Sequence, residues 1–210
     1  MTGKLDYKKD EKMYYLPAEH PVLITIPEMK FFMISGKGDP NTSESFSDAV
    51  QALYSLSYSI KMSPKSGNAP EQYQEYTIYP LEGVWDLEQA DESSDFSRLD
   101  KNRFIYTLMI RQPDFVSESF AEDILGIVKK KKPNPKLDEA RFETFQEGLC
   151  VQMMHIGSFD SESRSFQKIE QFLIEQGLSR ISHTHREIYL SDPRKTAPEK
   201  LRTVLRCQIH

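Results

Sequence analysis

The sequence predicts an α+β fold made of two similar halves. Apolar runs typical of strands alternate with segments of helical periodicity, and the same order of elements occurs in both halves of the chain. With 210 residues, of which 38% are hydrophobic and 11% aromatic, the chain can bury a sizeable core. We expect one domain over residues 1–210, with a first repeat at about 21–112, a linker helix at about 113–137 and a second repeat at about 138–210.

The first half begins with two β-rich runs. They lie within residues 21–38, are broken around residues 27–30 and are closed by Gly-Lys-Gly, which predicts strand, turn, strand. A helix is expected over about residues 43–61. Asn41 and Glu44 resemble a helix start, and apolar side chains then follow at the three-four spacing of one buried stripe.

Two further strands are expected in the first half, at Tyr73–Tyr79 and Arg103–Ile110. The stretch between them, residues 86–101, is acidic and rich in serine, and this composition predicts a loop.

The linker helix is expected to start at a capping box formed by Ser119 and Glu122 and to end at four lysines, residues 129–132. Such a run can indicate nucleic-acid binding. Cations at a helix C-terminus also offset the macrodipole, and this interpretation is favoured because the formal net charge is −5 and the pI about 5.6. The acidic balance gives no general attraction to nucleic acid or to anionic membranes, and it mildly favours a cationic ligand.

The second half contains a predicted helix at Ser163–Gln176, which Gly177 ends. The strands predicted around it are residues 141–146, Leu149–Ile156, His185–Leu190 and Leu201–Ile209.

The two halves resemble each other in sequence. Residues 33–39 resemble residues 154–160, and residues 77–79 align with residues 187–189. Each half would cover one sheet face with its main helix and leave the other face open. We therefore expect two antiparallel sheets side by side, with helices on the outer side and the uncovered faces lining a groove for a small, largely apolar ligand.

Strand alternation selects candidate residues for this groove. It places His185, Glu187 and Tyr189 on one side of their strand and Ile188 and Leu190 on the other. The aliphatic pair is expected to pack on the helix, so the polar three should face the groove. A carboxyl group beside aromatic rings is partly desolvated, which raises its pKa toward a range useful for proton transfer, and it also attracts delocalised cations. Catalysis and binding both remain open at this point.

The first half is expected to supply much of the aromatic wall. Tyr79 is predicted to face the groove. The strand that ends before Arg111 has two alternating sets of side chains, and the sequence leaves open which set faces the groove. The residues expected to line the groove are Trp85, Tyr106, Met109, Met153, His155, His185 and Phe104.

Several other classes of protein are disfavoured. His183, His185 and Glu187 alternate on one face, but scattered remaining histidines and the absence of a closely spaced Cys pair argue against a metal site. Phosphate-loop, dinucleotide and nucleophile-elbow motifs are missing. Cys150 and Cys207 lie in apolar runs and are expected to be reduced, buried thiols. With no signal peptide or membrane span in the sequence, we expect a cytoplasmic protein without a membrane partner or a cofactor.

A combination of features resembles the GyrI-like small-molecule-binding family. These are the Gly-x-Gly-Asp turn before a helix, the duplicated βαββ order, Trp85 after a sheet strand, and Glu187 within His-Arg-Glu-Ile-Tyr-Leu. The resemblance implies a pseudo-two-fold pair of SHS2-type modules with the ligand in a central groove. Some members are effector domains of multidrug-sensing regulators, in which an acid at the position of Glu187 meets cationic aromatic drugs. The short N-terminal segment cannot form a helix-turn-helix unit, so no direct nucleic-acid binding is expected.

Stand-alone members that resemble this chain hydrolyse cyclopropanoid, DNA-alkylating natural products such as yatakemycin. By that resemblance, Glu187 would activate water, Tyr79 or Tyr189 would donate to the developing phenolate oxygen, and Trp85 would stack on the flat ligand. The alternative is a non-catalytic protein that senses or sequesters cationic aromatic drugs. The oligomeric state is left open between a monomer and a homodimer.

Overall fold

Two long strands frame the sheet, β1 (Val22–Lys37) and β4 (Arg141–Ile156). The computed structural model describes residues 3–88 and 100–210. The turn predicted around residues 27–30 was wrong, because the antiparallel register between β1 and β4 runs past Pro27 without a shift. Pairing of β1 with β3 begins only at Lys30, so the missing N–H of Pro27 leaves no gap on that side.

Four shorter strands complete the sheet: β2 (Leu81–Leu87), β3 (Phe104–Gln112), β5 (His185–Tyr189) and β6 (Arg202–Gln208). The strand order is β1-β3-β2-β5-β6-β4, and β4 pairs back with β1, so the sheet closes into a barrel. All six pairings are antiparallel. The fold is therefore α+β, as predicted, with one closed sheet in place of two sheets side by side.

The strand predicted at Tyr73–Tyr79 was wrong. Its backbone makes only an isolated bridge, from Tyr76 to Leu5, and the strand of this region lies further on, in β2. Tyr76 is buried, and its hydroxyl donates to the Ser57 carbonyl at 3.3 Å. The aromatic residues that suggested a strand therefore pack against a helix. In the observed register Gly83 lies opposite Glu187.

The helices follow the predicted periodicity. They are α3 (Glu44–Met62), α4 (Glu118–Lys131) and α5 (Ser163–Gln176), preceded by the short α1 (Tyr7–Asp10) and α2 (Lys12–Tyr15). Short 3-10 turns occur at Ser63–Ser66, Lys101–Arg103, Pro135–Asp138, Phe159–Ser161 and Pro198–Lys200. The order β–α–β–β thus occurs as β1-α3-β2-β3 and as β4-α5-β5-β6. No helix among the described residues has both the length and the apolar character required to cross a membrane.

Serine side chains cap the first two of the long helices. The Ser43 hydroxyl accepts from the Phe46 N–H, and the Ser117 hydroxyl accepts from the Phe120 N–H, both at 3.2 Å. The cap expected at Ser119 therefore lies two residues earlier in the chain. Gly177 adopts a positive φ of 69° just after α5 and ends it as predicted.

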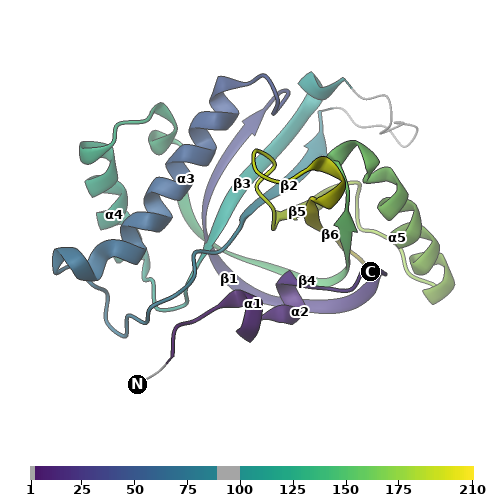
Figure 1. Cartoon of the computed structure of the whole chain (residues 1–210), viewed down its shortest axis with the longest axis horizontal. Helices are drawn as coiled ribbons and strands as arrows, with labels where there is room; N and C mark the ends of the chain where they lie inside the picture. Colours follow the sequence, from purple (N-terminus) through teal and green to yellow (C-terminus); the bar gives the residue numbers. More distant parts are fainter. Residues whose placement is uncertain (1–2, 89–99) are drawn as a thin grey trace.

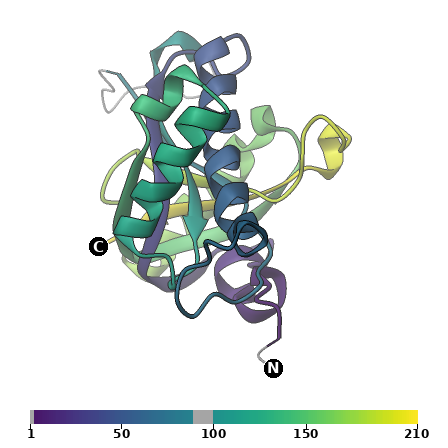
Figure 2. The same ribbon diagram turned by 90° about the vertical axis from the view of Figure 1, so that its left-hand side faces the viewer.

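Helices α3 and α5 lie over the same face of the sheet. Direct partners in an antiparallel ladder point to the same side, so Gly83, Glu187 and Leu205 share a face. Leu205 packs in a cluster with Ile169 of α5, while α3 packs over β1 and β3. In Figure 1, α3 lies to the left and α5 to the right of β2 and β5. Helix α4 lies on the far side of α3, and Figure 2 shows the two helices side by side.

The opposite face of the sheet carries a buried network of charges. The guanidinium Nη1 of Arg186 donates to Glu82 at 2.8 Å, and its Nε lies 3.0 Å from Glu147 Oε1. Arg206 Nη1 donates to the second oxygen of Glu147 at 3.0 Å. The aromatic rings of Phe31 and Phe145 flank Arg186, each with its centroid at 5.2 Å. Two positive and two negative charges thus compensate one another away from water.

The N-terminal segment closes this second face. The Tyr14 carbonyl accepts from Arg206 at 2.6 Å, Glu11 pairs with Arg111 at 2.7 Å, and Tyr15 is buried. The expectation that the face opposite the helices lines a groove was therefore wrong. Ile188 points to this filled face, across from Glu82, and the helices cover the side on which Glu187 lies.

Candidate functional site

Glu187 lies at the centre of β5, between β2 and β6, with Gly83 and Leu205 as its neighbours across the sheet. It is 8% exposed and lies on the face of the sheet that α3 and α5 cover. The Nε2 atom of His185 lies 3.1 Å from Glu187 Oε1. The three residues predicted to share this side of the strand, His185, Glu187 and Tyr189, do share it.

Trp85 and Tyr189 meet above Gly83. The indole Nε1–H donates to the Tyr189 hydroxyl at 2.7 Å. A Cβ atom added to Gly83 would lie 2.6 Å from that indole nitrogen and 3.1 Å from the hydroxyl oxygen. The absence of a side chain at Gly83 therefore makes the hydrogen bond across it sterically feasible.

The proton of Tyr189 is held firmly. Burial raises the pKa of this phenol well above 10, and the charge of Glu187 and a hydrogen bond with it raise the pKa further. The hydroxyl thus accepts from Trp85 and is hydrogen bonded with Glu187. Tyr189 thus lies between Trp85 and Glu187 and interacts with both.

Aromatic rings surround Trp85 on the side of α3. The ring centroids of Phe46, Phe104 and Tyr106 lie 6.1, 5.6 and 5.2 Å from that of Trp85. Phe46 comes from the first turn of α3, and the other two come from β3, so the observed set of β3 residues facing the site is Phe104, Tyr106 and Leu108. Tyr106 packs over Gly36, where an added Cβ atom would lie 2.5 Å from the ring.

Two more rings flank the site on the side of α5. Phe159 meets Tyr189 edge-on at 5.9 Å between centroids, and Phe166 of α5 meets His185 edge-on at 4.8 Å. Neither phenylalanine was expected at the site. Phe166 lies on the partly buried face of α5, but sequence periodicity does not say which strand that face meets.

Glu162, which was not predicted at all, is a second carboxyl group at the site. It precedes α5 as the N-cap residue, yet its side chain makes no capping hydrogen bond. It is 7% exposed, and its Oε1 atom is buried without a hydrogen-bond partner among the described residues. Burial raises the pKa of this carboxyl group well above 4.5, and the negative charge of Glu187 and a hydrogen bond with it raise the pKa further. The two carboxyl groups therefore interact with each other at this site.

Other expected groove residues lie at the edge of the site or away from it. His155 is buried, with Nδ1 2.9 Å from the Ser165 hydroxyl, and Met153 packs under α5. Met109 lies on the opposite face of the sheet with Met33.

Tyr79 lies in a separate cluster of aromatic residues with Tyr7 and Tyr15, and the Arg111 guanidinium is 4.7 Å from its ring centroid. The arrangement does not bring Met109 or Tyr79 to Glu187.

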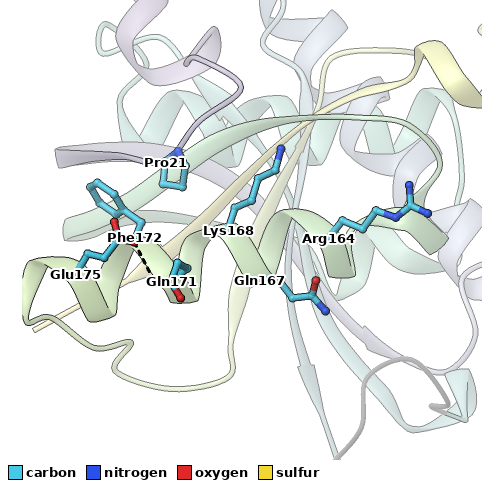
Figure 3. Close-up of a pocket in the computed structure, with 7 residues that line it drawn as sticks. All are labelled: Pro21, Arg164, Gln167, Lys168, Gln171, Phe172 and Glu175. Carbon is cyan, nitrogen blue, oxygen red and sulfur yellow. Dashed lines mark hydrogen bonds between the residues drawn. The ribbon is translucent and has the colours of Figure 1, made fainter.

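Two surface hollows lie near α5. The one in Figure 3 runs along this helix and is lined by Pro21, Arg164, Gln167, Lys168, Gln171, Phe172 and Glu175. The other lies beside His155 and Ser165. Neither includes Glu187 or Trp85, whose exposures of 8% and 7% show that packed side chains enclose them. Among the described residues no group of three His, Cys, Asp or Glu side chains could hold a metal ion.

The comparisons agree with this fold. Residues 20–209 match the model of a family described as the GyrI-like small molecule binding domain. A hydrolase from Listeria innocua has a solved structure with 38% identity, coverage of 99% of this chain and 100% of that chain, and a TM-score of 0.88. An uncharacterized conserved protein from the same organism has 40% identity, the same coverage and a TM-score of 0.90.

The EcmrR C-terminal domain, at 13% identity and a TM-score of 0.50, shares the fold; the match covers 90% of this chain and 96% of that domain. No curated protein matches the chain significantly. Since the family model spans nearly the whole sequence, the chain belongs to the GyrI-like small-molecule-binding family.

Proposed function

We propose that this protein binds a flat, largely apolar small molecule beside Trp85 and hydrolyses it, with Glu187 as the base that activates water. The observation that carries the proposal is the burial of Glu187 next to an indole, a phenol and an imidazole. A buried carboxylate that contacts an imidazole and lies among aromatic rings is placed to accept a proton from a bound water molecule. The description of a 38% identical relative as a hydrolase supports the same class of activity.

The proposed substrates are cyclopropanoid, DNA-alkylating natural products. Their strained ring becomes aromatic on opening, so one well-placed base suffices and no nucleophile triad is needed. Water adds to the ring carbon, the ring bond breaks, and its electron pair moves to the conjugated oxygen, which becomes a phenolate. The product no longer alkylates DNA, so the protein would protect the DNA of the cell in which it acts.

The repeated βαββ order supports a pseudo-symmetric pair of SHS2-type modules with unequal chemistry. Glu187 of the second half lies opposite Gly83 of the first, and Trp85, Phe104 and Tyr106 come from the first half. The second half would supply the acid and the first half much of the ring surface. A ligand that stacks on Trp85 displaces Phe46 or Phe104, since both rings contact the indole.

Mass spectrometry of the protein incubated with a cyclopropanoid tests the proposal. The wild type should convert the substrate to its water adduct, and Glu187→Gln should lower the rate by roughly 10²- to 10⁴-fold. Glu28→Gln, a change of an exposed acid on β1, is the matched control and should act as the wild type does. Equal rates in wild type and Glu187→Gln, or binding without any adduct in either protein, would overturn hydrolysis by Glu187.

A binding protein without catalysis is the second candidate function. Two carboxyl groups among aromatic rings, in a chain of net charge −5, suit a delocalised aromatic cation. Titration with a fluorescent cation tests this role. Tight binding that weakens in Glu187→Gln, with no adduct formed from any cyclopropanoid, would favour it over hydrolysis.

A further inference from the structure

We infer that Glu162 is a second catalytic residue, the proton donor that works with Glu187 as the base. This inference rests on the hydrolysis proposed above and assigns a residue to its second proton transfer. Activation of water by Glu187 leaves a negative charge on the substrate oxygen when the ring opens. That oxygen needs a proton, and the geometry points to Glu162 as its source.

The orientation of the Glu162 side chain is the first argument. An acid at the N-terminus of a helix gains stability by accepting backbone N–H groups there, and Ser43 and Ser117 make such bonds for α3 and α4. Glu162 precedes α5, but its backbone is helical (φ −62°, ψ −26°) where Ser43 and Ser117 are extended, and its side chain makes no capping hydrogen bond. Its carboxyl group turns inward and interacts with that of Glu187.

The environment of the carboxyl group is the second argument. At 7% exposure, with one oxygen lacking any partner among the described residues, Glu162 is in a costly position for an ionised acid. Two carboxyl groups in contact cannot both carry a full charge in such a site. Glu162 therefore holds the shared proton, in line with its raised pKa, and its buried, unpartnered oxygen would meet a substrate that displaces the packed rings.

Tyr189 is a poorer donor than Glu162. Its hydroxyl accepts from Trp85 and is hydrogen bonded with Glu187, so its proton is engaged within the protein. Its pKa is also raised well above 10, whereas the pKa of Glu162 is raised from an ordinary value of 4.5. A neutral carboxylic acid gives up its proton far more readily than such a phenol. Tyr189 is better suited to hold Glu187 in place.

The two acids complete a balanced cycle. Glu187 takes a proton from water as the water oxygen bonds to the ring carbon and the ring bond breaks. The electron pair of that bond reaches the substrate oxygen, which takes the proton of Glu162. Glu187 is now protonated and Glu162 ionised, and a direct proton transfer between the two restores the starting state. Substrate and water have combined into one product, which carries a new alcohol group and a phenol. No other reactant is consumed.

Activity of Glu162→Gln tests the role, because glutamine keeps the shape of the side chain but has no acidic proton to give. We expect its kcat on a cyclopropanoid to fall roughly 10²-fold or more. The wild-type rate should also decrease at high pH, where Glu162 loses its proton, and the rate of the variant should not show this decrease. Glu44→Gln, which removes an exposed acid at the start of α3, is the matched control and should keep the wild-type rate and pH profile.

Infrared spectroscopy provides a readout that does not depend on turnover. A difference spectrum of wild type minus Glu162→Gln at neutral pH should contain the carbonyl stretch of a protonated carboxyl group, and the difference for Glu44→Gln should lack it. If the wild type hydrolyses the substrate while Glu162→Gln retains its kcat and pH profile, Glu162 is not the donor and hydrolysis by Glu187 stands. Absence of the protonated band also overturns the inference. Failure of the wild type to form any adduct overturns both proposals together.

Discussion

The indole of Trp85 and the phenol of Tyr189 are joined by a 2.7 Å hydrogen bond across Gly83, although they lie on different strands. Trp85 is the only tryptophan in the sequence, so tryptophan fluorescence reports on the surroundings of this one indole. The bond ties β2 to β5, one of the two strand pairs at which the first and second halves of the chain meet.

Gly83→Ala should break this contact. The added methyl group would lie 2.6 Å from the indole nitrogen, so Trp85 and Tyr189 must move apart, which we expect to cost about 1–3 kcal/mol of unfolding free energy. Urea unfolding followed by tryptophan emission measures both effects. The control is Gly126→Ala in α4, where the new methyl group meets nothing within 4 Å and should stabilise the protein by about 0.5–1 kcal/mol. Unchanged stability and emission in Gly83→Ala would contradict the prediction.

Tyr189→Phe should leave the Trp85 N–H without its acceptor. The loss of a partner by a buried donor is expected to lower the unfolding free energy by about 1–2 kcal/mol and to shift the emission of Trp85. Tyr58→Phe, at a tyrosine that is 53% exposed, should change neither quantity. An equal effect of the two substitutions on emission would show that the hydrogen bond does not form in solution.

Much of the fold was predictable because its signals are local. The bounds of α5 follow from apolar spacing and from Gly177 just beyond its end, and both are confirmed. β2 was missed since Gly83 weakens its strand pattern, while tyrosines at positions 73–79 have the β propensity that suggested a strand. Closure of the sheet by β1 and β4 depends on pairing between distant segments, which no local pattern reveals.

The candidate site was predictable only on β2, β3 and β5. Alternation along β5 put His185, Glu187 and Tyr189 together, and this is confirmed. Glu162 was missed because an acid before a helix is expected to cap it, and nothing local to the sequence indicates that the side chain turns toward β5. Tyr79 was misplaced with the strand assigned to it.

The charge network on the second face should be sensitive to loss of one partner. Arg186→Met leaves Glu82 and Glu147 buried with less compensation, so we expect a loss of about 3–5 kcal/mol in unfolding free energy. Arg194→Met, which removes a largely exposed partner of Asp192, should have a much smaller effect on the unfolding free energy. Chemical denaturation of the two variants compares them. A cost for Arg186→Met as small as that for Arg194→Met would mean that the buried ion pairs contribute little to folding.

Stability should depend on pH through Glu162. Its pKa in the folded protein is raised above the ordinary 4.5, so between these two values the folded state binds more protons than the unfolded state. Its contribution to the unfolding free energy is fully present below about pH 4.5 and is lost as pH rises through the folded pKa. Urea unfolding of wild type and Glu162→Gln across this range should therefore show the variant gaining stability relative to wild type as pH rises. Glu118→Gln, at the exposed start of α4, should give a curve parallel to wild type. If Glu162→Gln also runs parallel, no proton is taken up by Glu162 on folding, and the two acids do not share one.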